Sequence, residues 1–380
     1  MTGIDAKAIV AREPTTTPTW GLEGVTVHEP GDDEVLVKIT ATGICHTDIL
    51  LSSIPSGSPA GIAYPKILGH EGAGIIQSIG KNITTVVPGD KVLLSYYSCS
   101  SCPQCEISKP MYCTQFNSEN YIGRKSTSIT PTESKEETWS RFFGQSSFAE
   151  YTIAAEASVV KVNELLESDE ELNLFAPLGC GFQTGMGAVA NVADAGRQDV
   201  VMILGMGAVG MAALMTAKIR ASRTIIAVDR FPSRLELAES LGATHTIDTT
   251  IPEFDFVQAV REISASGVSV AIDTTGVGWL IEGAIESLAP LGKMIHIASP
   301  PPDFRLSLDV TALFTTGKTI TGCIEGNCIP GEAIPQMIRW YREGRFPVDR
   351  LVAFFPAAEF GTALAQLHDG SVLKPVLTWS

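Results

Sequence analysis

The sequence predicts an α/β protein of two domains, the second of which is built on a doubly wound parallel sheet. A chain of 380 residues is long enough for two domains with well-filled cores. Short β-branched segments dominate the first part, whereas strands and helices alternate from about residue 182. The uninterrupted apolar run at 200–204 is typical of a strand that is covered on both faces, as in a parallel sheet.

Composition and charge narrow the classes of function. The formal net charge of −15 argues against binding to nucleic acid or to an anionic membrane surface, since both need a basic patch. No apolar run of about 18 residues predicts a membrane span, and the first five residues show no secretory pattern. Eight cysteines are too few for a disulfide scaffold at this length. We therefore expect a globular, cytoplasmic protein.

Strands and loops are expected in the first part of the chain. We predict strands at 35–40, 74–80 and 91–95. Thr47 and Asp48 follow the first of these strands and favour the start of a short helix. The polar segment 124–141 is predicted to be an exposed, mobile loop.

Side chains that bind metals occur at three separate places. His70 and Glu71 stand side by side among glycines, which permit tight backbone packing around them. Alone, such a pair is equally compatible with an ordinary surface position. Cys45 upstream and Cys180 far downstream change this interpretation, because two thiolates and one imidazole form the ligand set of a catalytic zinc with an open fourth position.

Four further cysteines have the spacing of a structural metal site. Cys99, Cys102, Cys105 and Cys113 fall within fifteen positions of the chain. Four thiolates at this spacing close a tetrahedron around zinc with no open position. Disulfides are the weaker alternative, because such short spacings strain a bridge. We predict a structural zinc that stiffens a lobe at about 96–116, where little hydrophobic core is available.

The predicted parallel sheet begins with a dinucleotide fingerprint. Gly205, Gly207 and Gly210 directly follow the apolar strand and precede a predicted helix, so that the backbone can approach a pyrophosphate at the helix N-terminus. The next strand ends at Asp229, which would bind the adenosine ribose and repel a 2′-phosphate, so NAD is favoured over NADP. The neighbouring Arg230 weakens that preference. An α/β domain without a nucleotide is the remaining alternative.

For some residues the sequence allows both a structural and a functional role. Phe142 and Phe143 suit either an ordinary core or the wall of an apolar pocket. Lys374, near the end of the sequence, suits either a surface position or a contact with phosphate. Cys323 and Cys328 are most simply free thiols. Further strands and helices are predicted at 224–228, 235–241, 268–273, 280–288, 293–298 and 334–343.

Taken together, these motifs resemble the zinc-containing medium-chain alcohol dehydrogenases over nearly the whole chain. The Gly-His-Glu motif at 69–71, the four-cysteine lobe, the segment 179–185 and the nucleotide fingerprint occur in the family's order and spacing. Within the family, the residues at 45–48, 94–96 and 142–148 look most like the aryl (benzyl) alcohol dehydrogenases.

The resemblance implies the fold and the assembly. Residues 1–181 and 325–380 would form a GroES-like, mostly-β catalytic domain, and residues 182–324 a Rossmann NAD-binding domain. Family members pair their nucleotide domains through sheet edges. We therefore expect a homodimer or homotetramer, and the stretch 319–324 is the candidate edge.

The resemblance also implies roles for individual residues. The implied ligands of the catalytic zinc are Cys45, His70 and Cys180, and Glu71 would lie behind the metal and ligate it transiently. Thr47 would bond the substrate oxygen and pass on its proton, while Asp48 would fix the tautomer of the histidine ligand. The implied cofactor-binding residues are His46, Thr184, Gly205, Gly207, Val209, Gly210, Asp229, Arg234 and Lys374, of which His46 and Lys374 would contact the pyrophosphate. The implied pocket residues, each equally suited to an ordinary core, are Ser95, Tyr96, Phe142, Phe143 and Ser299.

The implied activity is the interconversion of a primary, aromatic or allylic alcohol and its aldehyde, with NAD and two Zn²⁺ ions per chain. One position departs from the family: many relatives have a histidine at the end of the proton relay where this chain has Leu50. The proton would then leave Thr47 and the cofactor ribose by water or another base. Because the proton relay is shortened in this way, a second hypothesis is a zinc-containing NAD(P)H reductase of a polarised C=C or C=N bond in a biosynthetic pathway. A nucleotide-binding protein without catalysis is a third, which the retained zinc ligands disfavour.

Overall fold

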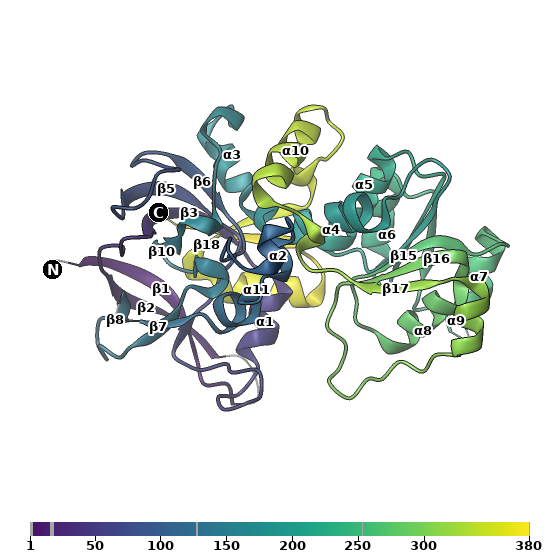
Figure 1. The fold of residues 1–380 in the computed structure, drawn as a ribbon, viewed down its shortest axis with the longest axis horizontal. Helices are drawn as coiled ribbons and strands as arrows, with labels where there is room; N and C mark the ends of the chain where they lie inside the picture. The colour runs from purple at the N-terminus through teal and green to yellow at the C-terminus, as the bar shows by residue number, and fades with distance from the viewer. Residues whose placement is uncertain (1–2, 16–18, 127, 253, 380) are drawn as a thin grey trace. The chain divides into compact units, whose positions relative to one another are not determined.

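The computed structural model describes residues 3–15, 19–126, 128–252 and 254–379, and the chain divides into two compact units (Figure 1). The first unit comprises Met1–Cys180, Ile329–Tyr341 and Pro347–Ser380, and the second comprises Gly181–Cys328 and Arg342–Phe346. These bounds differ by a few residues from the predicted ones. The short segment 342–346 goes with the second unit because the ring of Phe346 contacts that of Phe182, and Arg345 donates to the Ile219 carbonyl oxygen at 3.2 Å.

A long hairpin organises one sheet of the first unit. Strands β1 and β2 pair along their whole length, from Ile4 opposite Val27 to Arg12 opposite Thr19. The strand order of this sheet is β7-β9-β4-β1-β2-β8. Its strands are β1 (Ile4–Arg12), β2 (Thr19–Val27), β4 (Lys66–Ile67), β7 (Arg124–Ser126), β8 (Ile129–Pro131) and β9 (Thr138–Ser140).

Strand β3 (Glu34–Gly43) organises the other sheet of this unit, because it pairs with β5, β10 and β19. Alternate residues of β3, namely Val35, Val37 and Ile39, pack into one hydrophobic core. Through β19 the last strand of the chain joins the sheet that precedes Cys45. The remaining strands are β5 (Gly72–Ile79), β6 (Lys91–Leu94), β10 (Tyr151–Ala155), β11 (Val159–Lys161), β18 (Val352–Pro356) and β19 (Lys374–Thr378), and the helices are α1 (His46–Ser52), α2 (Pro103–Glu106), α3 (Asp169–Leu174), α10 (Pro330–Arg342) and α11 (Phe360–Asp369).

The prediction of an exposed, mobile loop at 124–141 is wrong, because much of this segment is ordered in strands. Residue 127 lies outside the described residues, but the rest includes β7, β8 and β9, which pair with one another or with β2 and β4. Ile129 and Thr138 are fully buried, and Arg141 is 7% exposed. The sequence did not reveal these strands because each is three residues long, too short to show an alternation of polar and apolar residues.

Lys66, on the two-residue strand β4, is buried beside the same region. Its ammonium donates to the carbonyl oxygens of Tyr121 at 2.8 Å and Ile122 at 2.6 Å, at the end of the π-helix η2 (Asn117–Ile122). The same ammonium lies 5.4 Å from the ring centroid of Phe142. Burial lowers the pKa of Lys66 to about 7.

We expect the substitution Lys66→Met to remove a pH dependence of stability. Between about pH 7 and the ordinary value of 10.5, the unfolded chain binds a proton at Lys66 that the folded chain does not, so the wild type gains stability as the pH rises. The gain is at most about 1.4 kcal/mol per pH unit. Melting temperatures of both proteins between about pH 6 and about pH 10 measure the effect. Parallel curves throughout this range would show that Lys66 stays charged when buried.

The second unit is built on a parallel sheet with the strand order β14-β13-β12-β15-β16-β17. In this order the chain starts in the middle and winds outward in both directions, so the predicted doubly wound α/β fold is confirmed. The strands are β12 (Val200–Leu204), β13 (Thr224–Asp229), β14 (His245–Asp248), β15 (Val268–Asp273), β16 (Leu288–His296) and β17 (Thr319–Gly322), and the helices are α4 (Gly181–Gly187), α5 (Ala208–Ile219), α6 (Pro232–Leu241), α7 (Phe256–Ile263), α8 (Gly278–Ser287) and α9 (Val310–Thr316).

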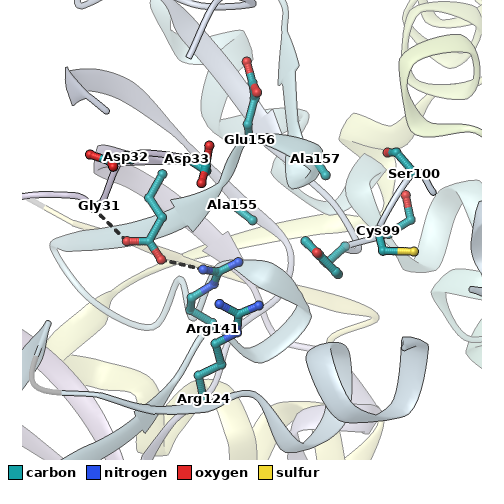
Figure 2. A pocket seen from close by; sticks show the side chains of 13 residues that line it. Gly31, Asp32, Asp33, Cys99, Ser100, Arg124, Arg141, Ala155, Glu156 and Ala157 are labelled. Atoms are coloured by element: carbon teal, nitrogen blue, oxygen red, sulfur yellow. Dashed lines mark hydrogen bonds and ion pairs between the residues drawn. The ribbon is translucent and has the colours of Figure 1, made fainter. Parts of the chain in front are cut away.

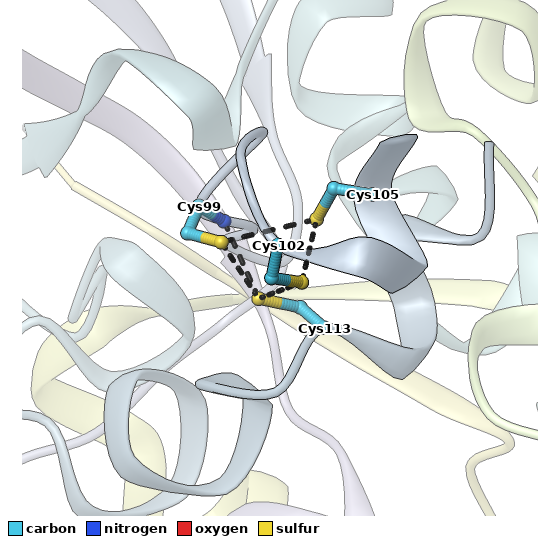
Figure 3. A group of neighbouring side chains, drawn as sticks. All are labelled: Cys99, Cys102, Cys105 and Cys113. Atoms are coloured by element: carbon cyan, nitrogen blue, oxygen red, sulfur yellow. Dashed lines mark hydrogen bonds between the residues drawn. The ribbon is translucent and has the colours of Figure 1, made fainter. Parts of the chain in front are cut away.

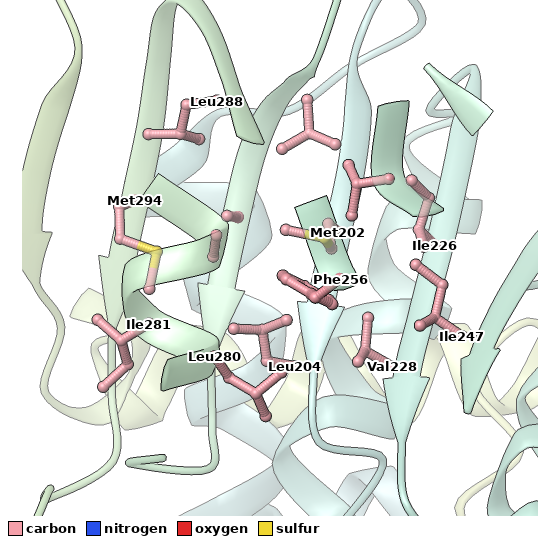
Figure 4. Packing of buried hydrophobic residues seen from close by; sticks show 14 of the residues in the cluster. Met202, Leu204, Ile226, Val228, Ile247, Phe256, Leu280, Ile281, Leu288 and Met294 are labelled. Carbon is pink, nitrogen blue, oxygen red and sulfur yellow. The ribbon is translucent and has the colours of Figure 1, made fainter. Parts of the chain in front are cut away.

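One face of this sheet packs on α7 and α8 (Figure 4). Alternate residues of the central strand, Met202 and Leu204, meet Phe256 of α7 and Leu280 of α8 in a single hydrophobic core. Burial of each such side chain contributes roughly 1.5–3 kcal/mol. The core thereby fixes the carboxyl end of β12, where the glycine loop begins. In the part of the chain that the structure describes, no helix is both long enough and apolar enough to cross a bilayer.

Candidate metal centres and glycine loop

Four side chains that can bind a metal converge in the first unit, although they are far apart in the sequence. Cys45 lies between β3 and α1, and His70 and Glu71 lie between β4 and β5. Cys180 follows the 3-10 helix η6 (Ala176–Gly179). One ligand atom from each residue lies within 4.8 Å of the others. The fold thus brings together the three residues expected to bind a catalytic zinc and the carboxylate expected behind it.

Asp48 holds two of these groups in place from the first turn of α1. Its Oδ1 lies 3.0 Å from Nδ1 of His70 and accepts from the Gly69 N–H at 3.0 Å, while its Oδ2 accepts from the Cys45 N–H at 2.9 Å. Both Asp48 and His70 are fully buried. With Nδ1 turned to the carboxylate, Nε2 of His70 is a buried nitrogen without a hydrogen-bond partner among the described residues. A metal ion at this point would satisfy it.

The electrostatics of the cluster favour a cation. The hydrogen bond from the Cys180 thiol lowers the pKa of Cys45 well below its usual range, against burial and with help from His70. Burial opposes a charge on His70, but the adjacent Asp48 carboxylate raises the pKa of the imidazole well above its usual range. Negative charge from the half-buried Cys45 and the fully buried Asp48 therefore lies next to this point. Two thiolates and one imidazole suit Zn²⁺ in particular.

Lys374 does not lie at the surface, which was one of its two predicted positions, while its contact with the cofactor pyrophosphate stays a prediction. Its side chain is 4% exposed, and its ammonium donates to both carboxylate oxygens of Glu71 at 2.9 Å and to the Ile44 carbonyl oxygen at 3.0 Å. Burial alone would lower the pKa of Lys374, but the Glu71 carboxylate raises it above its ordinary value. The three donors of the ammonium thus have partners inside the unit, and the lysine neutralises Glu71.

Aromatic rings enclose the histidine of the cluster. Phe143 stacks on the imidazole of His70 with 4.3 Å between centroids, and Phe142 meets it edge-on at 5.3 Å. Tyr121 continues the cluster, 5.6 Å from Phe143. The rings of Phe142 and Phe143 are therefore buried like core residues and also lie directly against a candidate metal ligand.

Other predicted site residues in the first unit lie nearby or at the surface. The hydroxyl of Thr47 lies 3.7 Å from Sγ of Cys45. Ser95 and Tyr96 are buried, and the Ser95 hydroxyl donates to the Gly179 carbonyl oxygen at 2.6 Å, next to Cys180. His46 is exposed at the start of α1, and Leu50, one turn further along, is 47% exposed.

Gln145 is a supporting residue that the sequence analysis missed. Its Nε2 donates to the carbonyl oxygens of His70 at 2.9 Å and Ser95 at 3.1 Å, and its Oε1 accepts from the Gly72 N–H at 3.1 Å. This fully buried amide fixes the backbone on both sides of the cluster. The sequence does contain a sign of this role: Gln145 is the one amide in the segment 142–148, whose other residues are aromatic or small. A buried amide needs hydrogen-bond partners, so such a residue is expected to support its surroundings.

The other four cysteines face one another in the lobe at 96–116 (Figure 3). The Sγ–Sγ distances are 3.4 Å for Cys99–Cys113, 3.6 Å for Cys102–Cys105, 3.9 Å for Cys102–Cys113 and 4.0 Å for Cys99–Cys105. A tetrahedron with Zn–S bonds of about 2.3 Å has edges of about 3.8 Å. All four are free thiols, so the disulfide alternative is not realised and the geometry fits a closed zinc site.

A polar cavity of about 560 Å³ lies against this lobe (Figure 2). Arg124 and Arg141 line it together with the turn that contains Glu34. The charges are mostly paired: Arg141 bonds Glu34, and Arg124 bonds Glu119. None of the lining residues belongs to the cluster of Cys45, His70 and Cys180.

The glycine loop of the second unit connects β12 to α5. Gly205 has φ +89°, a left-handed conformation that L side chains rarely adopt. A Cβ on Gly210 would lie 1.8 Å from the Gly205 carbonyl oxygen, so the helix can approach the loop only with glycine at this position. A Cβ on Gly207 would project into open space. The loop therefore leaves room beside the N-terminus of α5 for the phosphates of a dinucleotide.

Asp229, at the carboxyl end of β13, supports this loop. Its Oδ2 accepts from the Met206 N–H at 2.6 Å, and its Oδ1 accepts from the N–H groups of Arg230 at 2.7 Å and Phe231 at 2.9 Å. Arg234 lies over the ring of Phe231, 4.6 Å from its centroid. The other predicted cofactor and pocket residues of this unit are Thr184, which is buried on α4, Val209, which is on α5, and Ser299, which follows β16.

Known proteins match the chain in both units. The family model "Alcohol dehydrogenase GroES-like domain" matches residues 31–164, and the model "Zinc-binding dehydrogenase" matches residues 208–343. A geraniol dehydrogenase of Castellaniella defragrans is 34% identical, over 99% of this chain and 98% of the relative. The crystal structure of a benzyl alcohol dehydrogenase from Acinetobacter calcoaceticus is 38% identical, with a TM-score of 0.89 over 99% of this chain and 100% of that one. An alcohol dehydrogenase zinc-binding domain protein from Burkholderia ambifaria is 39% identical, with a TM-score of 0.91 over 99% of each chain.

We expect Asp48→Asn to weaken zinc binding at the cluster of Cys45, His70 and Cys180 by roughly 10–100-fold, because the amide no longer orients the imidazole as a carboxylate does. Zinc retained per chain during titration with a chelator measures the effect. The four-cysteine lobe is an internal control, since Asp48 contacts none of its thiols. Equal retention of zinc by variant and wild type would refute the orienting role.

Proposed function

The chain belongs to the zinc-containing alcohol dehydrogenases of the medium-chain dehydrogenase family, and we propose that it interconverts a primary aromatic or allylic alcohol and its aldehyde with NAD as hydride acceptor. The convergence of Cys45, His70 and Cys180, with Nε2 of the histidine unpartnered, carries the proposal. Three protein ligands leave the fourth position of a zinc ion for substrate, as in catalytic sites. Four cysteines in the separate lobe would hold a second, structural zinc.

The residues around the cluster have distinct tasks in this proposal. A bound zinc ion supplies Lewis acidity, which lowers the pKa of an alcohol hydroxyl to about 7. The Thr47 hydroxyl, 3.7 Å from Sγ of Cys45, takes the substrate proton and passes it on. Asp48 keeps Nε2 of the histidine ligand directed at the metal. Lys374 neutralises Glu71, so this carboxylate is held back from becoming a permanent ligand that would displace the substrate.

The second unit supports NAD as the cofactor. The open space at Gly207 and the close approach of Gly210 to Gly205 suit a pyrophosphate at the start of α5. The carboxylate of Asp229 ends β13 where the adenosine ribose hydroxyls are expected, and its charge disfavours the 2′-phosphate of NADP.

The aromatic surroundings of the metal ligands support the proposed substrate class. Phe142 and Phe143 lie against His70 and favour a flat or unsaturated substrate over a small polar one. Two similar proteins are named for geraniol, an allylic alcohol, and for benzyl alcohol, an aromatic one.

We also propose a homodimer or homotetramer that pairs through β17. This strand is the last in its sheet, so one of its edges has no neighbouring strand within the described chain. The preceding helix exposes Phe314 by 82% and Val310 by 73%, which is apolar area that a second copy would cover.

We expect Cys45→Ser to reduce alcohol oxidation by about a thousandfold or more, because the loss of a zinc ligand removes several kcal/mol of stabilisation from the transition state. NADH should still bind, since the glycine loop is unchanged. Turnover of benzyl alcohol and calorimetric titration with NADH measure the two effects. The matched control is Cys323→Ser, which alters a buried thiol outside both clusters. Full turnover by the Cys45 variant would refute the metal role.

A second candidate, reduction of a polarised C=C or C=N bond, is favoured by one observation: Leu50 stands where a proton-relay histidine is expected. Cinnamaldehyde offers both a carbonyl and a conjugated C=C bond, so its reduction by NADH separates the candidates. We expect cinnamyl alcohol as the product. A saturated aldehyde would contradict the alcohol dehydrogenase proposal and support the reductase.

A further inference from the structure

The turn at 141–146 has a strained backbone. The φ angles of Arg141, Phe143 and Ser146 are +63°, +53° and +58°, and that of Gly144 is +70°. This left-handed region is unfavourable for every residue that carries a Cβ, and a bulky side chain such as phenylalanine is rarely found there. A fold keeps such angles only where the surrounding structure imposes them, and they are concentrated at functional sites. The left-handed phenylalanine of this turn is therefore a feature that the packing of an ordinary core does not require.

Buried polar contacts impose this conformation on the turn. The fully buried hydroxyl of Ser146 accepts from the Phe142 N–H at 2.9 Å and donates to the Ile67 carbonyl oxygen at 2.6 Å. At the other end, the guanidinium of Arg141, whose side chain is 9% exposed, forms an ion pair with Glu34. The turn is thereby fixed to β4 at one end and to β3 at the other.

The turn places the ring of Phe143 flat on the imidazole of His70. The two ring planes differ by 22°, and their centroids are 4.3 Å apart. The rings of Tyr121 and Phe116 also lie against Phe143, with centroids at 5.6 Å and 6.2 Å, and Phe143 is 3% exposed. The phenyl ring therefore has little freedom to move away from the imidazole.

Such a ring complements what Asp48 does for the same histidine. The carboxylate lies 3.0 Å from Nδ1 of His70 and restrains the imidazole at one nitrogen only. A hydrogen bond tolerates a range of angles, so the ring can still tilt and carry Nε2 with it. A flat apolar surface against the face of the imidazole opposes this tilt. The direction of Nε2, which has no partner among the described residues, thus depends on both contacts.

We propose that Phe143 is a positioning residue for the metal ligand His70: its ring, held by the left-handed turn, keeps the imidazole plane in the orientation in which Nε2 meets the metal ion. The cluster of Cys45, His70 and Cys180 then holds zinc more tightly than its three ligands and Asp48 alone would achieve. The inference rests on the proposed zinc site, and it assigns to Phe143 a role other than lining a substrate pocket.

The test compares zinc retention at the cluster and at the four-cysteine lobe of the zinc-loaded, full-length protein. Zinc retained per chain is measured against graded concentrations of EDTA, and a Cys45→Ser protein identifies which part of the release belongs to the lobe. Phe143→Leu and Phe143→Met remove the ring but keep most of the apolar volume, whereas Phe143→Tyr keeps a ring that can stack. The matched control is Phe116→Leu, because this ring is similarly buried and contacts Phe143 but is not one of the two rings against His70.

For Phe143→Leu and Phe143→Met we expect the cluster to bind zinc about threefold to tenfold more weakly, the effect of one lost aromatic contact, while the lobe retains its zinc as in the wild type. Phe143→Tyr should stay within about twofold of the wild type. Phe116→Leu should leave the zinc affinity of the cluster unchanged.

Wild-type zinc affinity at the cluster in both Phe143→Leu and Phe143→Met would overturn the inference and leave the proposed function standing. An equal loss of zinc from cluster and lobe, or an equal loss at the cluster in Phe116→Leu, would also overturn it, since either result would assign the ring a general role in packing. A wild type that holds zinc only in the lobe would instead overturn the proposed zinc site itself.

Discussion

The balance of buried charge around the metal cluster is the constraint on which the rest of this structure depends. Asp48 and Glu71 are buried beside thiols that bind metals best as thiolates. Buried charges of one sign are costly unless opposite charges accompany them. Lys374 supplies one positive charge through its ion pair with Glu71, and a zinc ion would supply two more. The buried carboxylates and thiols of the cluster are therefore stable next to one another only when Lys374 and a metal ion compensate their negative charge.

The strand pairing of the first unit makes this balance possible. Strand β3 leads directly to Cys45, its neighbour β5 follows Glu71, and its other neighbour β19 begins at Lys374. Three segments from distant parts of the sequence therefore deliver a ligand, a carboxylate and an ammonium to one place. Gln145 and the two phenylalanines close the cluster on the side of the imidazole. In the second unit the candidate binding site is formed by backbone geometry around the glycines of the loop between β12 and α5. This geometry suits phosphate groups rather than a metal ion.

Much of this arrangement could be predicted from the sequence because it depends on local spacing. The glycine fingerprint between an apolar strand and a helix, and four cysteines within one short segment, each specify a local geometry. The partner of Lys374 could not be predicted, because nothing local relates residue 374 to residue 71; only the antiparallel pairing of β19 with β3 does so. The strands in 124–141 were missed for a related reason: they are ordered by pairing with β2 and β4, not by their own composition.

The central claim is that Cys45, His70 and Cys180 hold one zinc ion while Glu71 remains paired with Lys374. Anomalous diffraction from crystals at the zinc absorption edge tests it most directly. The account predicts two peaks per chain, one among the four cysteines of the lobe and one bonded to Nε2 of His70 and the two thiolates, with the Glu71–Lys374 pair intact. A single peak in the lobe, or a second zinc ion that takes Glu71 as a permanent ligand, would contradict it.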